Sequence, residues 1–224
     1  GLSRIGGVLG GINTALKGTF LTHVLSNTKA RIGVFEPEFL PWLAEIEDTV
    51  PDMAVVYVPG DVYDPDSLPA FKRIEVRCFD EIMTGGDDEI ETEVTYRDIG
   101  MIMFTSGTTG PSKGALMPHG HLYLFGLCMQ THLAMTTEDH YYIPMPLFHA
   151  QGILMQLYAT LITGSSAVLV RQFRATTWID DIRKHKATLA NLLGVMNDFV
   201  LRQPAKDTDT DNNLRMVCAV PVTE

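Results

Sequence analysis

A stretch of ten residues combines the side chains that bind phosphate. It runs Thr-Ser-Gly-Thr-Thr-Gly-Pro-Ser-Lys-Gly from Thr105 to Gly114 and directly follows the apolar run Gly100–Phe104. Glycines let a backbone turn sharply and expose its N–H groups, hydroxyls donate hydrogen bonds to phosphate oxygens, and a lysine supplies a mobile positive charge. The stretch is therefore predicted to hold the phosphates of a nucleotide.

The spacing within this loop argues against an ordinary phosphate-loop NTPase. That class carries the pattern Gly-x-x-x-x-Gly-Lys-Ser/Thr. Counted from Gly107, Lys113 falls at the required position, but Ser112 replaces the second glycine and Gly114 replaces the magnesium-binding hydroxyl residue. Half of the fixed positions fail, so another class of nucleotide-binding protein is favoured.

The same residues resemble the phosphate loop of the adenylate-forming superfamily, which includes acyl- and aryl-CoA synthetases, peptide-synthetase adenylation domains and firefly luciferase. Its pattern is Thr-Ser-Gly-Thr-Thr-Gly-x-x-Lys-Gly, and Ser112 stands where the family usually has proline. The resemblance implies catalytic roles for Lys113 and Thr109, with Thr109 also a contact of the Mg²⁺ that bridges the phosphates. The residues that it implies for ATP binding are Thr105, Ser106, Gly107, Thr108, Thr109, Gly110 and Lys113.

Other segments agree with this resemblance in chain order. Tyr142–Gly152 contains Pro-Leu-Phe-His, whose histidine or aromatic residue lies beside the acyl and adenylate pocket in the family. Taken alone, His149 reads as a core histidine; the resemblance makes it a wall or gate of the substrate pocket instead of the general base. Gly194 and Val195 fall where the family lines its acyl pocket, and Arg4–Leu16 resembles a packing segment of the family.

The resemblance covers almost the whole chain and looks closest to carnitine or crotonobetaine–CoA ligase-like proteins. It implies a ligase that joins a small-molecule carboxylate to ATP as acyl-AMP, releases pyrophosphate, and then transfers the acyl group to CoA. ATP, Mg²⁺ and CoA are the implied cofactors. Two alternatives stay open: an adenylation enzyme with another thiol acceptor, and a non-catalytic nucleotide-binding module.

Several parts of the family pattern are missing from the sequence. These are the aromatic-x-Thr-Glu motif that holds magnesium, the ribose-binding aspartate, the hinge, and the C-terminal domain with its catalytic lysine. Cys218–Pro221 stands where the family usually has Gly-Gly-Ala-Pro, which argues against adenine contact there. We expect residues 1–224 to be a single truncated N-terminal AMP-binding domain, inactive when isolated.

Apolar, β-branched runs alternate with helical periodicity along the chain, which favours an α/β fold with a mainly parallel sheet flanked by helices. The N-terminal Gly1–Asn13 reads as part of a helix, and Pro59–Glu93 as a long excursion with one edge strand. The predicted strands are Arg31–Phe35, Ala54–Val58, Gly100–Phe104, Ala167–Val170, Thr188–Leu192 and Arg215–Val220. The predicted helices are Gly18–Asn27, Pro37–Asp48, His121–Leu133, Gln151–Ile162, Thr177–His185 and Val195–Arg202.

Composition and charge exclude other classes of function. A formal charge of −10 opposes nucleic-acid binding, which depends on basic residues that displace counterions. Three separated cysteines and no secretory signal indicate reduced thiols and a cytoplasmic protein. Proline and glycine interrupt both long uncharged stretches, so we expect no transmembrane segment, while a homo-oligomer stays open.

Two other groups of side chains are weighed as metal sites and rejected. His119 and His121 lack the third or fourth ligand that zinc sites usually need. The acidic run Asp87–Glu93 reads as a solvated face.

Overall fold

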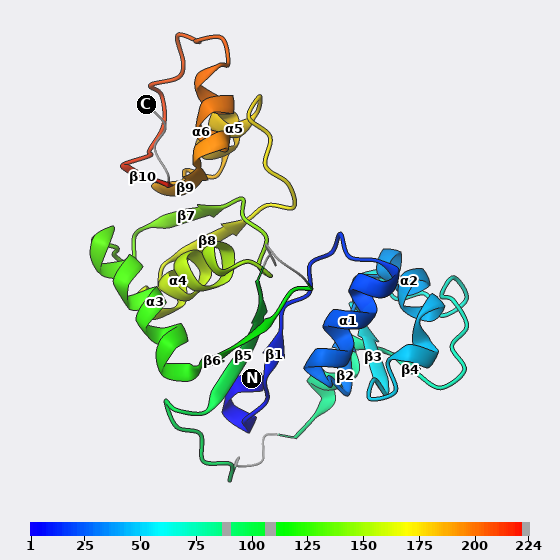
Figure 1. The fold of residues 1–224 in the computed structure, drawn as a ribbon. Coiled ribbons are helices and arrows are strands. Elements are labelled where there is room, and N and C mark those ends of the chain that lie inside the picture. Colours follow the sequence, from blue (N-terminus) through cyan, green and yellow to red (C-terminus); the bar gives the residue numbers. More distant parts are fainter. Residues whose placement is uncertain (87–90, 106–110, 221–224) are drawn as a thin grey trace. The chain divides into compact units, whose positions relative to one another are not determined.

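The computed structural model describes residues 1–86, 91–105 and 111–220 of the chain (Figure 1). The chain divides into two compact units, Gly1–Met117 and Pro118–Glu224. The sequence-based prediction of a single domain stays a prediction, and each unit is described by itself below.

The first unit contains two three-stranded sheets. One has the order β1-β5-β6, and the other, β2-β3-β4, is parallel throughout. The strands are β1 (Leu9–Gly10), β2 (Ile32–Val34), β3 (Val55–Val58), β4 (Glu75–Cys78), β5 (Ile99–Phe104) and β6 (Gly114–Pro118). The helical segments are η1 (Leu2–Ile5), α1 (Gly18–Thr28), η2 (Pro37–Phe39), α2 (Leu40–Glu45), η3 (Glu47–Thr49), η4 (Gly60–Val62) and η5 (Phe79–Thr84).

Apolar periodicity explains why α1 and α2 cover one face of the β2-β3-β4 sheet. Leu21 and Leu25 lie one turn apart on α1, and both are buried with Leu40 and Leu43 of α2. They pack in one core with Val56 of the central strand β3. An apolar stripe at this spacing is the face that a helix buries against a sheet.

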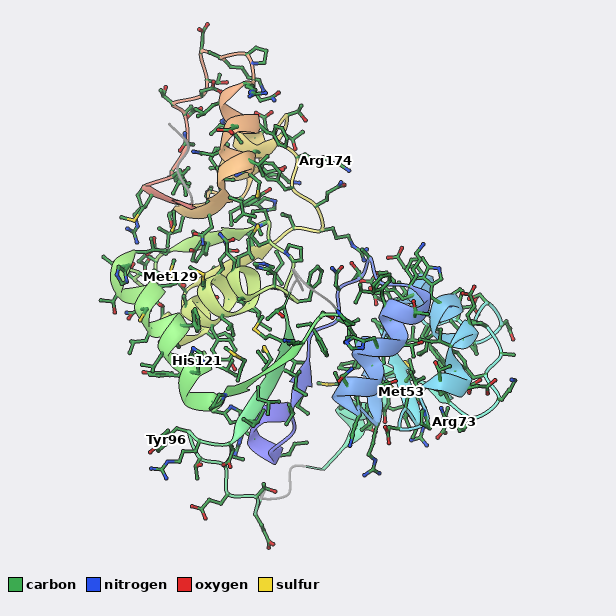
Figure 2. The ribbon with its side chains drawn as sticks, in the orientation of Figure 1. Met53, Arg73, Tyr96, His121, Met129 and Arg174 are labelled. Carbon is green, nitrogen blue, oxygen red and sulfur yellow. The ribbon has the colours of Figure 1, made fainter. Side chains whose placement is uncertain are left out.

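The charged side chain of Glu47 is buried, and it holds the backbone that leads into β4. It is only 4% exposed, and its carboxylate accepts hydrogen bonds from the backbone N–H groups of Lys72, Arg73 and Ile74 at 2.7–2.9 Å. Arg73 donates in turn to the carbonyl of Met53 (Figure 2). Burial alone would raise the pKa of Glu47, but the three backbone hydrogen bonds and the charge of Arg73 hold it below its ordinary value.

The second unit is a four-stranded parallel sheet of order β10-β9-β7-β8 (Figure 1). Its strands are β7 (His140–Ile143), β8 (Ser166–Leu169), β9 (Leu189–Leu193) and β10 (Met216–Val220). Its helices are α3 (His119–His132), the π-helix η6 (Gln151–Leu157), α4 (Tyr158–Thr163), α5 (Trp178–Lys184) and α6 (Gly194–Leu201).

Neighbouring residues of β7 pack into two different hydrophobic cores, one on each face of the sheet. Tyr142 packs with Trp178 and Ile182 of α5, while its neighbour Tyr141 packs with Met129 of α3. Successive residues of a strand point to opposite faces, and a parallel sheet is normally covered on both. The second unit therefore has the arrangement that strand–helix alternation predicts.

The buried residue Asp139 links the N-terminal ends of the four strands through its carboxylate and its backbone carbonyl. Asp139 precedes β7 and is 3% exposed. Its carboxylate accepts hydrogen bonds from Nε and Nη2 of Arg215, which precedes β10, at 2.8 and 2.7 Å. The Thr188 hydroxyl, before β9, donates to Asp139 at 2.7 Å, and Ser166 N of β8 donates to the Asp139 carbonyl at 3.0 Å. The hydrogen bond from Arg215 is the largest influence on the Asp139 carboxyl and holds its pKa well below the ordinary range.

The α/β prediction is confirmed, and so is the predominance of parallel pairing. The expected Gly1–Asn13 helix is wrong: the first residues form the short η1 and then β1. The strands also form three sheets instead of one, and β1, β6 and β7 lie outside the predicted strands. Among the described residues, no helix combines the length and apolar character that crossing a membrane requires.

Candidate functional site

The predicted phosphate loop joins β5 to β6. Ser106, Gly107, Thr108, Thr109 and Gly110 lie outside the described residues, and so does the metal contact predicted for Thr109. At the base of the loop, Thr105 N donates to the carbonyl of Lys113 at 3.0 Å. This hydrogen bond brings Lys113 to the end of β5.

Lys113 and Gly114 lie at the junction of the loop with β6. The side chain of Lys113 is exposed. A Cβ on Gly114 would lie 2.9 Å from Ile102 Cγ2 of β5, which is too close for an ordinary contact. Gly114 is therefore required for the close approach of β6 to β5, and Lys113 projects from the point where the two strands meet.

His23 is a contact of the loop that the sequence reasoning missed. It lies on α1, half-buried, and its Nε2 is 2.7 Å from the carbonyl oxygen of Ser112. The two residues are 89 positions apart, so no local pattern signals the pairing. The only hint is that His23 and Asn27, four residues apart, lie on the polar side of an amphipathic helix.

The Pro-Leu-Phe-His segment turns back after β7 in the second unit. His149 is exposed, its N–H donates to the Pro146 carbonyl at 3.1 Å, and its Nδ1 accepts from Gln151 N at 3.3 Å. The ring is thus held at the start of η6. A π-helix is rare and frequently occurs at functional sites.

Gly152 explains how η6 packs so tightly on this segment. A Cβ there would lie 2.5 Å from the carbonyl oxygen of Pro146 and 2.7 Å from that of Met145. Backbone therefore packs against backbone, and only glycine fits without displacing the segment that carries His149.

Gly194 and Val195 begin α6 directly after β9. Gly194 is buried, whereas Val195 is 56% exposed. The strands β7 and β9 are parallel neighbours, with Tyr141 opposite Leu189. Their C-terminal ends therefore share one edge of the sheet, so His149, Gly194 and Val195 all follow strands that end there. Ligands of open α/β sheets bind outside this edge.

Polar groups are buried beneath this edge. The Tyr141 hydroxyl donates to Asn191 Oδ1 at 2.5 Å, and Gln156 Nε2 donates to the Tyr142 carbonyl at 3.4 Å. Burial raises the pKa of Tyr141, and burial with the charge of Asp181 raises that of Tyr142 to about 12. Both tyrosines therefore stay neutral at physiological pH and act as hydrogen-bond donors.

The remaining candidates are the histidines and the acidic run that were weighed as metal sites. Within the described ranges, no group of three or more His, Cys, Asp and Glu side chains could hold a metal ion. His121 instead lies against Phe125, with ring centroids 5.0 Å apart (Figure 2 labels His121). Asp87, Asp88 and Glu89, which belong to the acidic run weighed as a cation site, lie outside the described residues.

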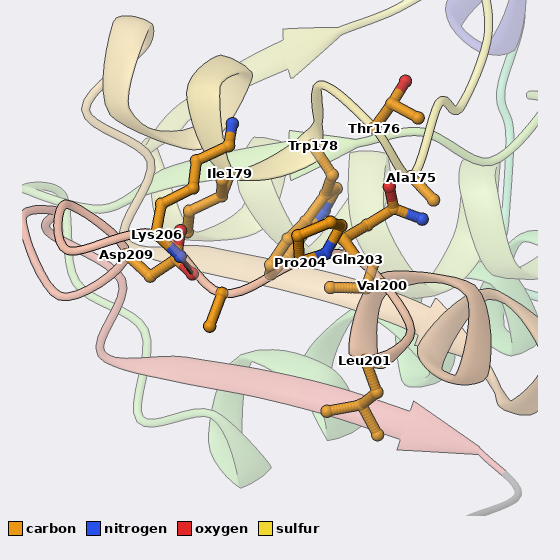
Figure 3. A pocket seen from close by; sticks show the side chains of 11 residues that line it. Ala175, Thr176, Trp178, Ile179, Val200, Leu201, Gln203, Pro204, Lys206 and Asp209 are labelled. Atoms are coloured by element: carbon orange, nitrogen blue, oxygen red, sulfur yellow. Dashed lines mark hydrogen bonds between the residues drawn. The ribbon is translucent and has the colours of Figure 1, made fainter.

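A separate pocket of about 380 Å³ lies between the start of α5, the end of α6 and the following loop (Figure 3). Trp178, Val200 and Pro204 form apolar walls. The charged groups on its rim are already engaged, since Lys206 pairs with Asp180 at 3.1 Å and its N–H donates to the Asp209 carboxylate. The pocket contains none of the residues that the sequence predicts to be functional.

Comparison with known proteins identifies the class that this fold and loop define. The family of AMP-binding enzymes matches residues 1–223, and the chain belongs to that family. A similar curated protein is the crotonobetaine/carnitine–CoA ligase of Salmonella typhimurium, 27% identical over 97% of the chain. The chain spans 41% of that relative's length. The resemblance to carnitine or crotonobetaine–CoA ligase-like proteins is thereby confirmed.

Solved structures of other proteins share the fold. The anthranilate CoA ligase AuaEII in complex with anthranoyl-AMP superposes with a TM-score of 0.81 at 23% identity, over 97% of this chain and 41% of that one. ATP-bound MatB from Rhodopseudomonas palustris gives 0.74 at 23% identity, over 96% of this chain and 40% of that one. At this identity the likeness concerns the fold.

Proposed function

We propose that the protein containing this chain is an AMP-forming acyl-CoA synthetase. A substrate carboxylate attacks the α-phosphorus of ATP, giving acyl-AMP and pyrophosphate, and the thiol of CoA then displaces AMP. The observation that carries the proposal is the Thr105–Gly114 loop, whose ends meet at the carbonyl of Lys113, in a member of the AMP-binding family.

The loop acts electrostatically in this proposal. The hydroxyls of Thr105, Ser106, Thr108 and Thr109 and the ammonium of Lys113 hold the β- and γ-phosphates, while Gly107 and Gly110 allow backbone N–H groups to approach them. Thr109 would hold Mg²⁺, which would supply further positive charge to offset that of the phosphates. Holding the leaving pyrophosphate in place and offsetting its charge lowers the barrier to adenylation.

The carboxylate occupies the C-terminal edge of the β10-β9-β7-β8 sheet. His149 forms the wall or gate of its pocket, and Gly194 and Val195 line the acyl group. The shared strand edge and the close packing of Gly152 under the histidine segment support this assignment. The three cysteines are free, which suits the cytoplasm that we propose as the compartment.

Carboxylate-dependent exchange of labelled pyrophosphate into ATP tests the proposal in the full-length protein. The acids to compare are carnitine, crotonobetaine, short and medium fatty acids, and aryl acids. Exchange with one class establishes adenylation and names the substrate class. A folded protein that binds ATP without exchange favours the non-catalytic module, whereas exchange without CoA-dependent AMP release favours another thiol acceptor.

Replacing Lys113 tests the role of the loop directly. Removing one preorganised charge-stabilising donor costs other enzymes roughly 3–4 kcal/mol of transition-state stabilisation. Lys113→Ala should therefore slow pyrophosphate exchange by about two to three orders of magnitude. The exposed Lys184 at the end of α5 gives the matched control, since Lys184→Ala should leave the rate unchanged. Near-normal exchange by Lys113→Ala contradicts the assigned role.

A further inference from the structure

We infer that His23 is a positioning residue that sets the direction of Lys113 in the phosphate loop. The inference rests on the proposed function, because it assigns His23 a part in binding the phosphates of ATP. It is carried by the 2.7 Å contact between His23 Nε2 and the carbonyl of Ser112, the residue directly before Lys113.

The hydrogen-bond partners of His23 define its tautomer. The carbonyl of Ser112 can only accept, so Nε2 carries the proton and donates it. On the other side of the ring, the amide Nδ2 of Asn27 lies 3.3 Å from Nδ1 and 2.6 Å from the His23 carbonyl. An amide nitrogen can only donate, so Nδ1 accepts. Asn27 thus keeps the ring in the orientation that Ser112 needs.

Packing and hydrogen bonds fix the position of α1, the helix that carries His23. Its opposite flank buries Leu21 and Leu25 in the core of the first unit, where they are 4% exposed. Ser26 Oγ adds a 3.3 Å hydrogen bond to the Thr49 carbonyl. A Cβ on Gly10 of β1 would lie 3.2 Å from Thr28 Cγ2. Helix α1 therefore also packs closely on the β1-β5-β6 sheet, whose strands β5 and β6 are joined by the loop.

Two hydrogen bonds hold the peptide planes on both sides of Lys113. The carbonyl of Ser112 belongs to the plane before Lys113 and is held by His23. The carbonyl of Lys113 belongs to the plane after it and is held by Thr105 N at 3.0 Å. Peptide units are planar, so fixing both planes fixes the two backbone torsions between them and the direction of the Cα–Cβ bond.

This arrangement addresses a weakness of lysine as a phosphate ligand. Lysine is a point charge on a flexible stem, and it does not bind phosphate in the fixed geometry of arginine. A fixed Cα–Cβ direction restricts the volume that the ammonium can reach, which lowers the entropy cost of binding ATP. His23 acts on ATP through Lys113 and does not touch it.

The experiment compares MgATP binding and pyrophosphate exchange in the full-length protein and its variants. His23→Ala should raise the Kd and KM for MgATP roughly five- to tenfold, the range expected for one lost hydrogen bond. The KM for the carboxylate should not change. His23→Gln, which keeps an N–H donor, should recover most of the affinity. The control is His132→Ala, because His132 bonds to a carbonyl of its own helix, that of Cys128.

Two further measurements separate positioning from a general structural role. In the Lys113→Ala background, His23→Ala should weaken MgATP binding no further, because the two residues act as one unit. In the ligand-free protein, His23→Ala should speed amide hydrogen exchange of the peptide around 111–116 while α1 keeps its protection. Asn27→Ala, which frees the ring, should give a smaller effect of the same kind.

The outcomes are distinguishable from failure of the proposed function. Wild type that binds MgATP and exchanges pyrophosphate, with His23→Ala matching it, overturns the positioning role and leaves the synthetase intact. Additive losses in the double variant overturn it as well. Wild type that neither binds MgATP nor exchanges pyrophosphate overturns the synthetase, and the hydrogen-exchange comparison still decides whether His23 holds the loop.

Discussion

At the scale of single residues, buried carboxylates stabilise each unit away from the predicted chemistry. In the first unit, the Glu47 carboxylate accepts hydrogen bonds from three backbone N–H groups. In the second unit, the Asp139 carboxylate accepts hydrogen bonds from Thr188 and Arg215 at the N-terminal edge of the β10-β9-β7-β8 sheet. The residues with predicted roles in this sheet follow its opposite, C-terminal edge. In the second unit, the stabilising contacts of Asp139 and the residues of the proposed substrate site therefore lie at opposite edges of the same sheet.

Replacing Asp139 should destabilise the protein in a pH-dependent way. Asp139→Asn breaks a buried pair and leaves Arg215 without its carboxylate; because Arg215 is partly exposed, we expect a loss of about 2–3 kcal/mol at pH 7. The pKa of Asp139 is lower in the folded chain than its unfolded value of about 3.9. Its stabilisation is thus fully present above that value and lost as pH falls toward the folded pKa.

Urea unfolding of both proteins at pH 7, 5 and 3 measures this difference. The gap in unfolding free energy between wild type and Asp139→Asn should narrow as the pH falls. Asp180, which pairs with Arg183 and Lys206 at an exposed position, supplies the control. Asp180→Asn should change stability little. An equal gap at every pH would show that the Asp139 charge does not stabilise the fold.

At the scale of elements, the backbone packing of η6 on the histidine segment makes a sharp prediction. Gly152→Ala places a methyl group 2.5 Å from the Pro146 carbonyl oxygen, so the segment must move. We expect a loss of about 1–3 kcal/mol in stability and a raised KM for the carboxylate, because His149 lies in the displaced turn. Gly85→Ala is the control, since its nearest neighbour would lie at 3.4 Å. Unchanged values for Gly152→Ala would contradict the packing account.

The elements also show what local sequence predicts. Strands such as β3 and β9 and helices such as α1 and α6 were predictable, because apolar periodicity and β-branched runs are local signals. The strands β1 and β6 contain glycine, and β6 ends in proline, so their propensity for strand is weak. The division into three sheets depends on long-range pairing.

The same distinction holds for the candidate site. The predicted phosphate loop is a contiguous pattern, so it could be singled out directly, and its position after β5 was predicted correctly. The hydrogen bond from His23 to Ser112 depends on tertiary packing across 89 positions, so no local spacing reveals it. His149 and Gly194 were predicted from a resemblance, and only the parallel pairing of β7 and β9 shows that their segments leave one sheet edge.

At the scale of the whole molecule, the resemblance implies that the proposed reaction uses groups outside these 224 residues. The chain spans 41% of a curated relative, and the magnesium-binding glutamate, the ribose-binding aspartate and the C-terminal lysine of the family pattern have no match in its sequence. In the proposed function the loop holds phosphates, but the catalytic lysine that the resemblance implies is not among these residues. We therefore predict that the 224-residue chain alone releases no AMP above background with any carboxylate.

The isolated chain and the full-length protein should be compared at equal concentration in the same assay. Circular dichroism and hydrogen exchange first establish that the isolated chain is folded, with α1 and β9 protected. A folded chain without AMP release, beside an active full-length protein, places the missing catalytic groups in the remaining sequence. Robust AMP formation by the folded isolated chain would contradict the prediction, and the catalytic groups would then have to lie within residues 1–224.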